Sequence, residues 1–171
     1  RGSPTDQGFD VSVGASFAGG VDTHFFPFVS DKEGSHIAPP NLNGTSRGDY
    51  LTDHLTKETI TLMNEFKNNP FFIVLAHYAV HTPIEGKEEL TAKYKRKRKK
   101  LQDVGQYIWD HGSYCKTTQD DPTYASMVQS VDDSVGLIRT ALEDLKLTKN
   151  TIIVFTSDNG GKADTVNKEK V

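Results

Sequence analysis

The chain has 171 residues, a net charge of −3 and a single cysteine, Cys115. A slightly acidic balance gives no general electrostatic basis for binding nucleic acid or acidic membranes, and one cysteine excludes an internal disulfide framework and any multi-cysteine zinc site. Hydrophobic residues make up 35% of the chain without Gly, and even when its 14 glycines are allowed for this share is below the ~45–50% of most globular domains. We therefore expect a thin core, or one completed by residues outside this chain, and an incomplete domain.

Residues 1–50 are predicted to form an ordered loop region. Gly, Pro, Ser and Asn recur there beside isolated aromatic residues, with no helical or strand period, and the aromatics are numerous enough to anchor a loop on a surface. No apolar run in the chain approaches the ~20 residues that a membrane-spanning helix needs. We therefore expect no membrane span.

A first helix is predicted after this loop, with Thr52 or Asp53 as its cap. Its apolar stripe has helical spacing and consists of Leu55, Thr59, Leu62, Met63 and Phe66. The run Asn-Asn-Pro at 68–70 ends the helix. The following run at 71–76, Phe-Phe-Ile-Val-Leu-Ala, predicts a short buried strand.

Two more helices and a second strand complete the predicted order. The helices are expected over 87–101 and from Asp121 and Pro122 to Leu145, and the strand over 151–156. Helix, buried strand, helices and buried strand in succession over 51–171 predict an α/β fold. Its sheet would be mostly parallel, flanked by helices and joined by right-handed crossovers.

Polar residues follow the second predicted strand. Asp158 and Asn159 stand there, before Gly160 and Gly161, and ligands of open α/β sheets bind beyond the carboxyl ends of the strands. Carboxylate and amide oxygens suit calcium or magnesium better than zinc. An Asp-Asn-Gly-Gly run on its own is more often an ordinary turn, and that alternative stays open.

The first predicted strand leads to His81, which precedes Thr82 and Pro83. Proline restricts the residue before it to extended conformations, so the histidine is held at the strand end with its ring outward. An imidazole titrates near neutral pH and can donate a proton to a departing oxygen. A loop histidine satisfied by hydrogen bonds is the alternative, and His77 on the same strand has no assigned role.

Two segments resemble motifs of sulfatases of the alkaline phosphatase superfamily. The run at 70–83, Pro-Phe-Phe-Ile-Val-Leu-Ala-His-Tyr-Ala-Val-His-Thr-Pro, resembles their central histidine motif, and the run at 150–161, Asn-Thr-Ile-Ile-Val-Phe-Thr-Ser-Asp-Asn-Gly-Gly, resembles their second calcium-binding strand. Residues 124–147 look like the helix before that strand, and residues 4–10 are similar to the segment after the family's lysine-tryptophan-histidine run. The resemblance covers nearly the whole chain, so 1–171 is expected to be part of a sulfatase catalytic domain.

The resemblance implies a formylglycine-dependent sulfuric ester hydrolase that holds sulfate with calcium. It makes Asp158 and Asn159 metal ligands and His81 the catalytic histidine beside the bridging oxygen. It also implies a sulfated small molecule or glycan as the substrate, with a pattern nearer to bacterial carbohydrate sulfatases. Finally, it implies a periplasmic, lysosomal or secreted location.

The nucleophile of the resembled family is missing from this chain. That residue lies in a C/S-x-P/A-x-R motif, whereas Cys115 is followed by Lys-Thr-Thr-Gln. No paired aspartates lead an N-terminal strand, and the family's late catalytic lysine is also absent. We therefore expect an internal fragment that is inactive alone, with the formylglycine in a missing N-terminal segment.

Rival functions remain open. One is a phosphoryl hydrolase of the same superfamily, against which Asn159 argues because phosphodiesterase relatives usually place histidine there; another is a module that binds calcium or sulfated ligands without turnover. The basic run at 95–100, Lys-Arg-Lys-Arg-Lys-Lys, could bind a sulfated polysaccharide, nucleic acid or an import receptor. Like charges on a helix are more often a solvated surface, and no aromatic pattern in the sequence accompanies them, so no nucleic-acid partner is expected.

Overall fold

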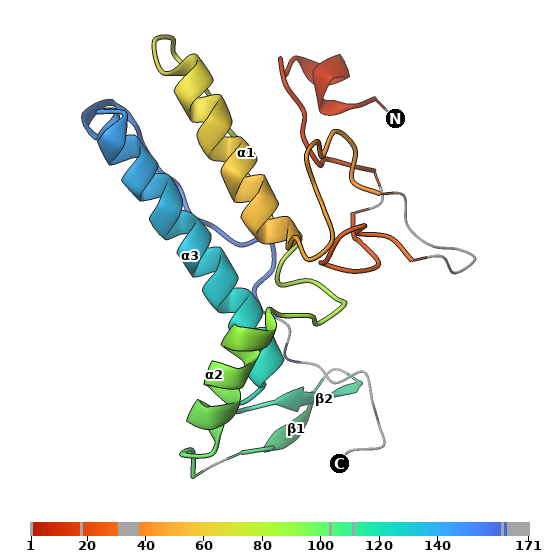
Figure 1. Ribbon diagram of the computed structural model, residues 1–171. Coiled ribbons are helices and arrows are strands. Elements are labelled where there is room, and N and C mark those ends of the chain that lie inside the picture. Colours follow the sequence, from red (N-terminus) through yellow and green to blue (C-terminus); the bar gives the residue numbers. More distant parts are fainter. Residues whose placement is uncertain are drawn as a thin grey trace.

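The computed structural model describes residues 2–17, 19–30, 38–102, 104–110, 112–161 and 163. Two long helices, α1 (Leu51–Phe66) and α3 (Pro122–Asp144), pack side by side, and the shorter α2 (Glu88–Arg98) packs against the start of α3 (Figure 1). None of the helices in these ranges is long and apolar enough to cross a membrane. The architecture is therefore a helical layer joined to a long loop region.

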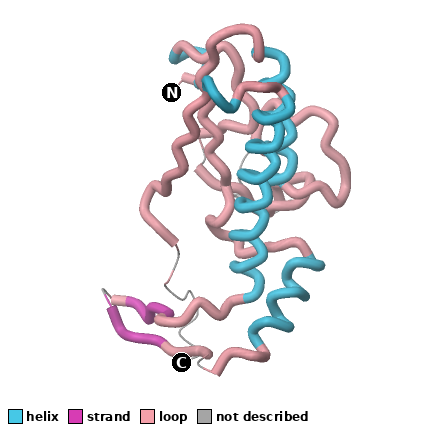
Figure 2. The backbone as a smooth tube through the Cα atoms, turned by 90° about the vertical axis from the view of Figure 1, so that its left-hand side faces the viewer, coloured by secondary structure: helices cyan, strands magenta, loops and turns pink. Residues whose placement is uncertain are grey.

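The remaining elements are short. An antiparallel hairpin of β1 (Tyr107–Asp110) and β2 (Ser113–Lys116) lies at the same end of the molecule as α2. The 3-10 turn η1 (Pro4–Gln7) lies near the N-terminus, and η2 (Thr148–Asn150) directly follows α3. Figure 2 shows that the N-terminal region before α1 is almost entirely loop. An isolated β-bridge pairs Phe25 of this region with Tyr50, the residue directly before α1.

Helix α1 begins at Leu51, and its N-cap is Tyr50, whose side chain makes no capping hydrogen bond. The N–H of Leu51 instead donates to the carbonyl of His24, 2.9 Å away. The prediction of Thr52 or Asp53 as the cap is wrong, because a carbonyl of the distant N-terminal loop satisfies the first free N–H of the helix.

Helices α2 and α3 lie where the sequence predicts them. Asp121 caps α3, and its Oδ1 accepts hydrogen bonds from the N–H groups of Thr123 (2.8 Å) and Tyr124 (3.0 Å). Pro122 at the first helical position loses no hydrogen bond there. The last turn of α2 is wholly basic, which complements the negative end of the helix dipole.

Two apolar clusters hold these parts together. One joins the N-terminal loop to α1 and consists of Val21, Phe28, Leu51 and Leu55. The other joins α1 to α3 and consists of Met63, Ala141 and Leu142. Burial of a Val, Leu, Phe or Met side chain in these clusters stabilises the fold by about 1.5–3 kcal/mol, so the loop region is fixed to the helical layer rather than free of it.

The predicted parallel sheet is not formed in the described part of the chain. Segments 71–76 and 151–156 each turn back behind the helix that precedes them and run in the same direction (Figure 1). Neither makes a backbone hydrogen bond to another described residue. A strand needs a neighbour with a facing row of N–H and C=O groups, and no described segment supplies one, so the expected strands are unpaired.

The two unpaired segments pack differently. In the first, residues 71, 73 and 75 contact the apolar clusters, whereas Phe72 and Val74 are 78% and 60% exposed. This period of two is that of a strand with one buried face. In the second, Ile152 and Val154 are 90% and 80% exposed, so that segment lies on the surface.

The hairpin is a feature that the sequence pattern did not predict. Its register pairs Tyr107 with Lys116 and Trp109 with Tyr114, and Gly112 in the turn has a positive φ of 86°. The aromatic and β-branched run of β1 favours a strand, but four residues are too short for a clear period.

Candidate functional site

His81 is exposed and lies on the half-buried loop between segment 71–76 and α2. Its backbone N–H donates to the carbonyl of Tyr78 (2.9 Å), and its ring Nδ1 lies 2.9 Å from the carbonyl of Thr82. Because a carbonyl only accepts, Nδ1 carries the hydrogen in this contact. Nε2 makes no hydrogen bond to a described residue, so this atom is available to a ligand.

The ring of His81 borders a hollow of about 470 Å³. Its other lining residues come from the neighbouring loop and from the turn after the histidine: Gly19, Gly20, Val21, Asp22, Thr82 and Pro83. The hollow is polar on the Asp22 side and open to solvent. Asp22 and His81 are the two ionisable side chains that line it.

A buried histidine supports the loop from behind. His24 is fully buried, and its Nε2 donates to the carbonyl of His81 over 3.0 Å. Burial is the main cause that lowers the pKa of His24, so the ring is neutral at neutral pH, with its single N–H on Nε2. Its Nδ1 is buried without a partner among the described residues.

Glu85 is the second support. Its Oε2 accepts hydrogen bonds from the Thr23 hydroxyl (2.7 Å) and from the N–H of His24 (2.9 Å). The hydroxyl of Tyr50 donates to the carbonyl of Glu85 (2.9 Å). The histidine loop is thus fixed at both ends of its turn by residues that are distant in sequence.

His77 faces the helices rather than the hollow. Its Nε2 lies 3.0 Å from the hydroxyl of Ser134, which is 2.6 Å from the hydroxyl of Thr56. Burial lowers the pKa of His77 to about 4, partly opposed by Asp53. A neutral imidazole between α1 and α3 is therefore part of the packing, and we assign it no contact with a ligand.

Asp158 and Asn159 lie on an exposed turn whose hydrogen bonds to the described residues are all local. Oδ1 of Asp158 accepts from the N–H of Asn159 (2.8 Å), and the hydroxyl of Ser157 accepts from the N–H of Gly160 (2.9 Å). Gly160 has a positive φ of 85°, which a glycine adopts without strain. Neither Asp158 nor Asn159 lines the hollow beside His81.

The donor chemistry of this turn fits part of a calcium site. Its carboxylate and amide oxygens are hard ligands, but calcium takes 6–8 oxygens, and two side chains supply a minority of them. In the described ranges, no three His, Cys, Asp or Glu side chains are close enough to hold a metal. The turn can contribute ligands, whereas a complete coordination shell needs further groups.

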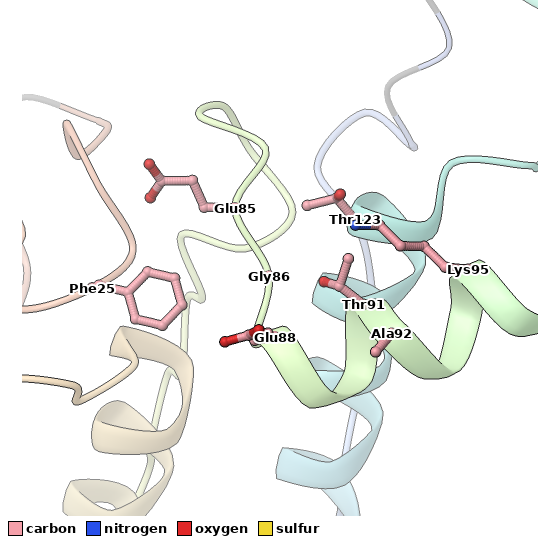
Figure 3. Close-up of a pocket in the computed structure, with 8 residues that line it drawn as sticks. All are labelled: Phe25, Glu85, Gly86, Glu88, Thr91, Ala92, Lys95 and Thr123. Carbon is pink, nitrogen blue, oxygen red and sulfur yellow. The ribbon is translucent and has the colours of Figure 1, made fainter.

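A second pocket, of about 460 Å³, lies between Phe25, the turn at Glu85 and Gly86, and the facing side chains of α2 (Figure 3). The carboxylate of Glu88 lies on the side of the Phe25 ring, and Lys95 and Thr123 lie on the opposite side of the view. Glu85 and Gly86 belong to this wall and connect it with the His81 loop. The pocket carries both charges, and Lys95 on its border begins the basic run.

Cys115 lies on β2, half-buried, with its Sγ 3.7 Å from the Ser113 hydroxyl. It borders neither pocket. Of the groups that surround His81, the sequence did not identify His24 and Glu85. Their partners are about 60 positions away, and no local pattern marks such contacts.

Comparison with known proteins places these features in a family. The family model described as Sulfatase matches residues 7–170. A "Sulfatase" of Formosa agariphila is 33% identical over 130 residues, which cover 70% of this chain and 20% of that protein. Human steryl-sulfatase is 28% identical, covering 71% and 16%, and mouse N-acetylgalactosamine-6-sulfatase is 29% identical, covering 64% and 17%. The chain thus spans about a fifth or less of the length of these relatives.

Proposed function

Because the chain belongs to the sulfatase family, we propose that it supplies the leaving-group histidine and two calcium ligands of a sulfuric ester hydrolase. His81 is the histidine, and Asp158 and Asn159 are the ligands. The observation that carries the proposal is the anchored His81, which lines a solvent-open hollow and whose Nε2 makes no hydrogen bond to a described residue. The nucleophile belongs to residues outside this chain, and the segment alone is inactive.

The proposed role of His81 follows from the bond that breaks. When the S–O bond to the bridging oxygen cleaves, that oxygen takes the electron pair and needs a proton. A protonated imidazole can donate it from Nε2 while Nδ1–H remains on the Thr82 carbonyl. Calcium held by the turn would supply charge withdrawal from the sulfate oxygens.

The substrate class that we propose is a sulfated carbohydrate. One relative is named N-acetylgalactosamine-6-sulfatase and another steryl-sulfatase, so family membership alone leaves the class open. The basic end of α2, one short helix away from the histidine loop, favours a polyanionic substrate over a sterol. A periplasmic, lysosomal or secreted location would suit such a substrate.

The test of His81 uses the full-length protein and a series of sulfate esters. In His81→Asn, we expect kcat/KM to fall by about 10²–10⁴ for alkyl and sugar sulfates and much less for 4-nitrophenyl sulfate, whose leaving group needs no proton. Unchanged thermal stability would show that folding is intact. An equal loss for every leaving group would contradict the proton-donor role.

The test of the turn is calcium affinity. We expect Asp158→Ala and Asn159→Ala each to weaken calcium binding at least about tenfold, since each removes a hard ligand. Asp132→Ala is the matched control, because this aspartate is exposed on α3. Unchanged affinity in both turn variants would remove the metal assignment and leave a phosphoryl hydrolase or a binding module to be tested with phosphate esters.

A further inference from the structure

The charge at one end of the molecule is concentrated and largely unpaired. Lys95 to Lys100 occupy the last turn of α2 and the two residues beyond it, and all six are exposed. Of the six, only Arg98 forms an ion pair with a described residue, Asp120. Like charges at i and i+4, such as Lys95 with Lys99, destabilise a helix by about 0.2–0.5 kcal/mol per pair, so the helix dipole alone does not account for this charge density.

An aromatic face lies beside this charge. In the hairpin register, Tyr107 stands opposite Lys116 and Trp109 opposite Tyr114, which places these four side chains on one face of the ribbon. The rings of Trp109 and Tyr114 meet edge to face at 5.0 Å, and the ammonium of Lys116 lies 5.8 Å from the centre of the Tyr107 ring. Trp109 is 60% exposed.

Asp120 joins the two features into one surface. Its carboxylate is fully buried and binds Arg98 of α2, Lys116 of β2 and the N–H of Gly105 in the connecting loop. Hydrogen bonds from these groups lower the pKa of Asp120 despite its burial. The basic end of α2 and the aromatic face of the hairpin therefore have a fixed relation, and both lie at the same end of the molecule (Figures 1 and 2).

We propose that this surface, residues 95–100 with Tyr107, Trp109 and Tyr114, binds the chain of a sulfated polysaccharide. The cations would pair with sulfate groups, and the flat apolar faces of Trp109 and Tyr114 would pack against sugar rings. Helix α2 extends about 16 Å at 1.5 Å per residue, so one polymer could reach from the surface towards the His81 loop. This inference rests on the proposed function for its choice of sugar over nucleic acid, since cations and aromatics also suit single strands.

The test exploits the fact that Trp109 is the single tryptophan of the chain. We expect dextran sulfate to change its fluorescence in a saturable, salt-sensitive way, and unsulfated dextran to leave it unchanged. Replacing Lys95, Arg96, Lys97, Lys99 and Lys100 with Gln should weaken the binding at least about tenfold at low ionic strength. Arg98 is kept because it holds Asp120.

The control variant replaces the same number of exposed basic residues elsewhere: Lys57, Lys67, Arg139, Lys146 and Lys149. It should bind dextran sulfate like the unchanged chain. A variant Trp109→Ala, followed by the salt concentration that elutes it from immobilised dextran sulfate, should bind more weakly although its charge is unaltered. Circular dichroism checks that all variants keep their helices.

Three outcomes would overturn the inference: no fluorescence change, equal weakening in the control variant, or equal or tighter binding of single-stranded DNA of matched charge. The last result would assign the surface to nucleic acid. None of these variants touches His81, Asp158 or Asn159. Failure of hydrolysis or calcium binding with dextran sulfate binding intact would therefore refute the proposed function alone.

Discussion

Segments 71–76 and 151–156 are both apolar and both lead to polar residues, but they differ in the contacts that hold them in place. The first, 71–76, has one buried face and leads to a loop held by His24 and Glu85. The second, 151–156, is largely exposed and leads to a turn with only local hydrogen bonds. The loop of His81 is therefore fixed by contacts within this chain, whereas the turn of Asp158 and Asn159 has only local contacts among the described residues.

The largest change in stability is expected at His24, the buried histidine that supports the His81 loop. In His24→Ala, we expect the free energy of unfolding to fall by about 3–4 kcal/mol, because the change leaves a cavity and an unsatisfied His81 carbonyl. Urea unfolding measures it. Phe17→Ala, at a side chain that is 72% exposed, is the control and should change it by less than about 0.5 kcal/mol.

The next effect is a pH dependence of stability. The pKa of His77 is about 4 in the fold against 6.5 unfolded, so the unfolded chain binds more protons between these values and stability falls as the pH falls through this window. The loss reaches up to about 3 kcal/mol near pH 4. His77→Gln retains a donor to Ser134 but does not titrate. Its stability should decline less steeply than that of the unchanged chain, and identical slopes would contradict this account.

Alanine substitutions at Gly86 and Gly160 test the same difference between the His81 loop and the turn after segment 151–156. A Cβ at Gly86 would lie 3.0 Å from the Thr123 carbonyl and 1.6 Å from the Ser126 hydroxyl, so Gly86→Ala should destabilise by about 2 kcal/mol. The double change with Ser126→Gly should recover part of this. At Gly160, no atom lies within 4 Å, and an alanine there should cost only about 1 kcal/mol of positive-φ strain.

The smallest effect is expected at the turn of Asp158 and Asn159. Asp158→Ala and Asn159→Ala should change the free energy of unfolding without calcium by less than about 0.5 kcal/mol. Both side chains are exposed, and among the described residues their one hydrogen bond is that from the Asn159 N–H to Oδ1 of Asp158. A loss above about 1 kcal/mol would show that the turn is packed more firmly than its contacts indicate.

The features that the sequence predicted correctly are those set by neighbouring residues in the chain, such as helix caps and apolar stripes. Helix α3 begins at Pro122 because Asp121 caps it, and the apolar stripe of α1 has helical spacing. Pairing of segments 71–76 and 151–156 could not be read from their composition, since a strand forms only with a neighbour. The contact of His24 with the His81 carbonyl escaped prediction for the same reason: the partners meet only in the fold.

The exposed side chains of segment 71–76 also affect the solubility of the chain. Phe72 and Val74, together with the 151–156 surface, offer apolar side chains next to backbone groups without partners among the described residues. A second molecule can pair its own backbone with these groups as an added strand and cover the exposed apolar side chains. Concentrated samples should therefore bind hydrophobic dyes and aggregate as the concentration rises, which makes dilute handling or a solubility tag advisable.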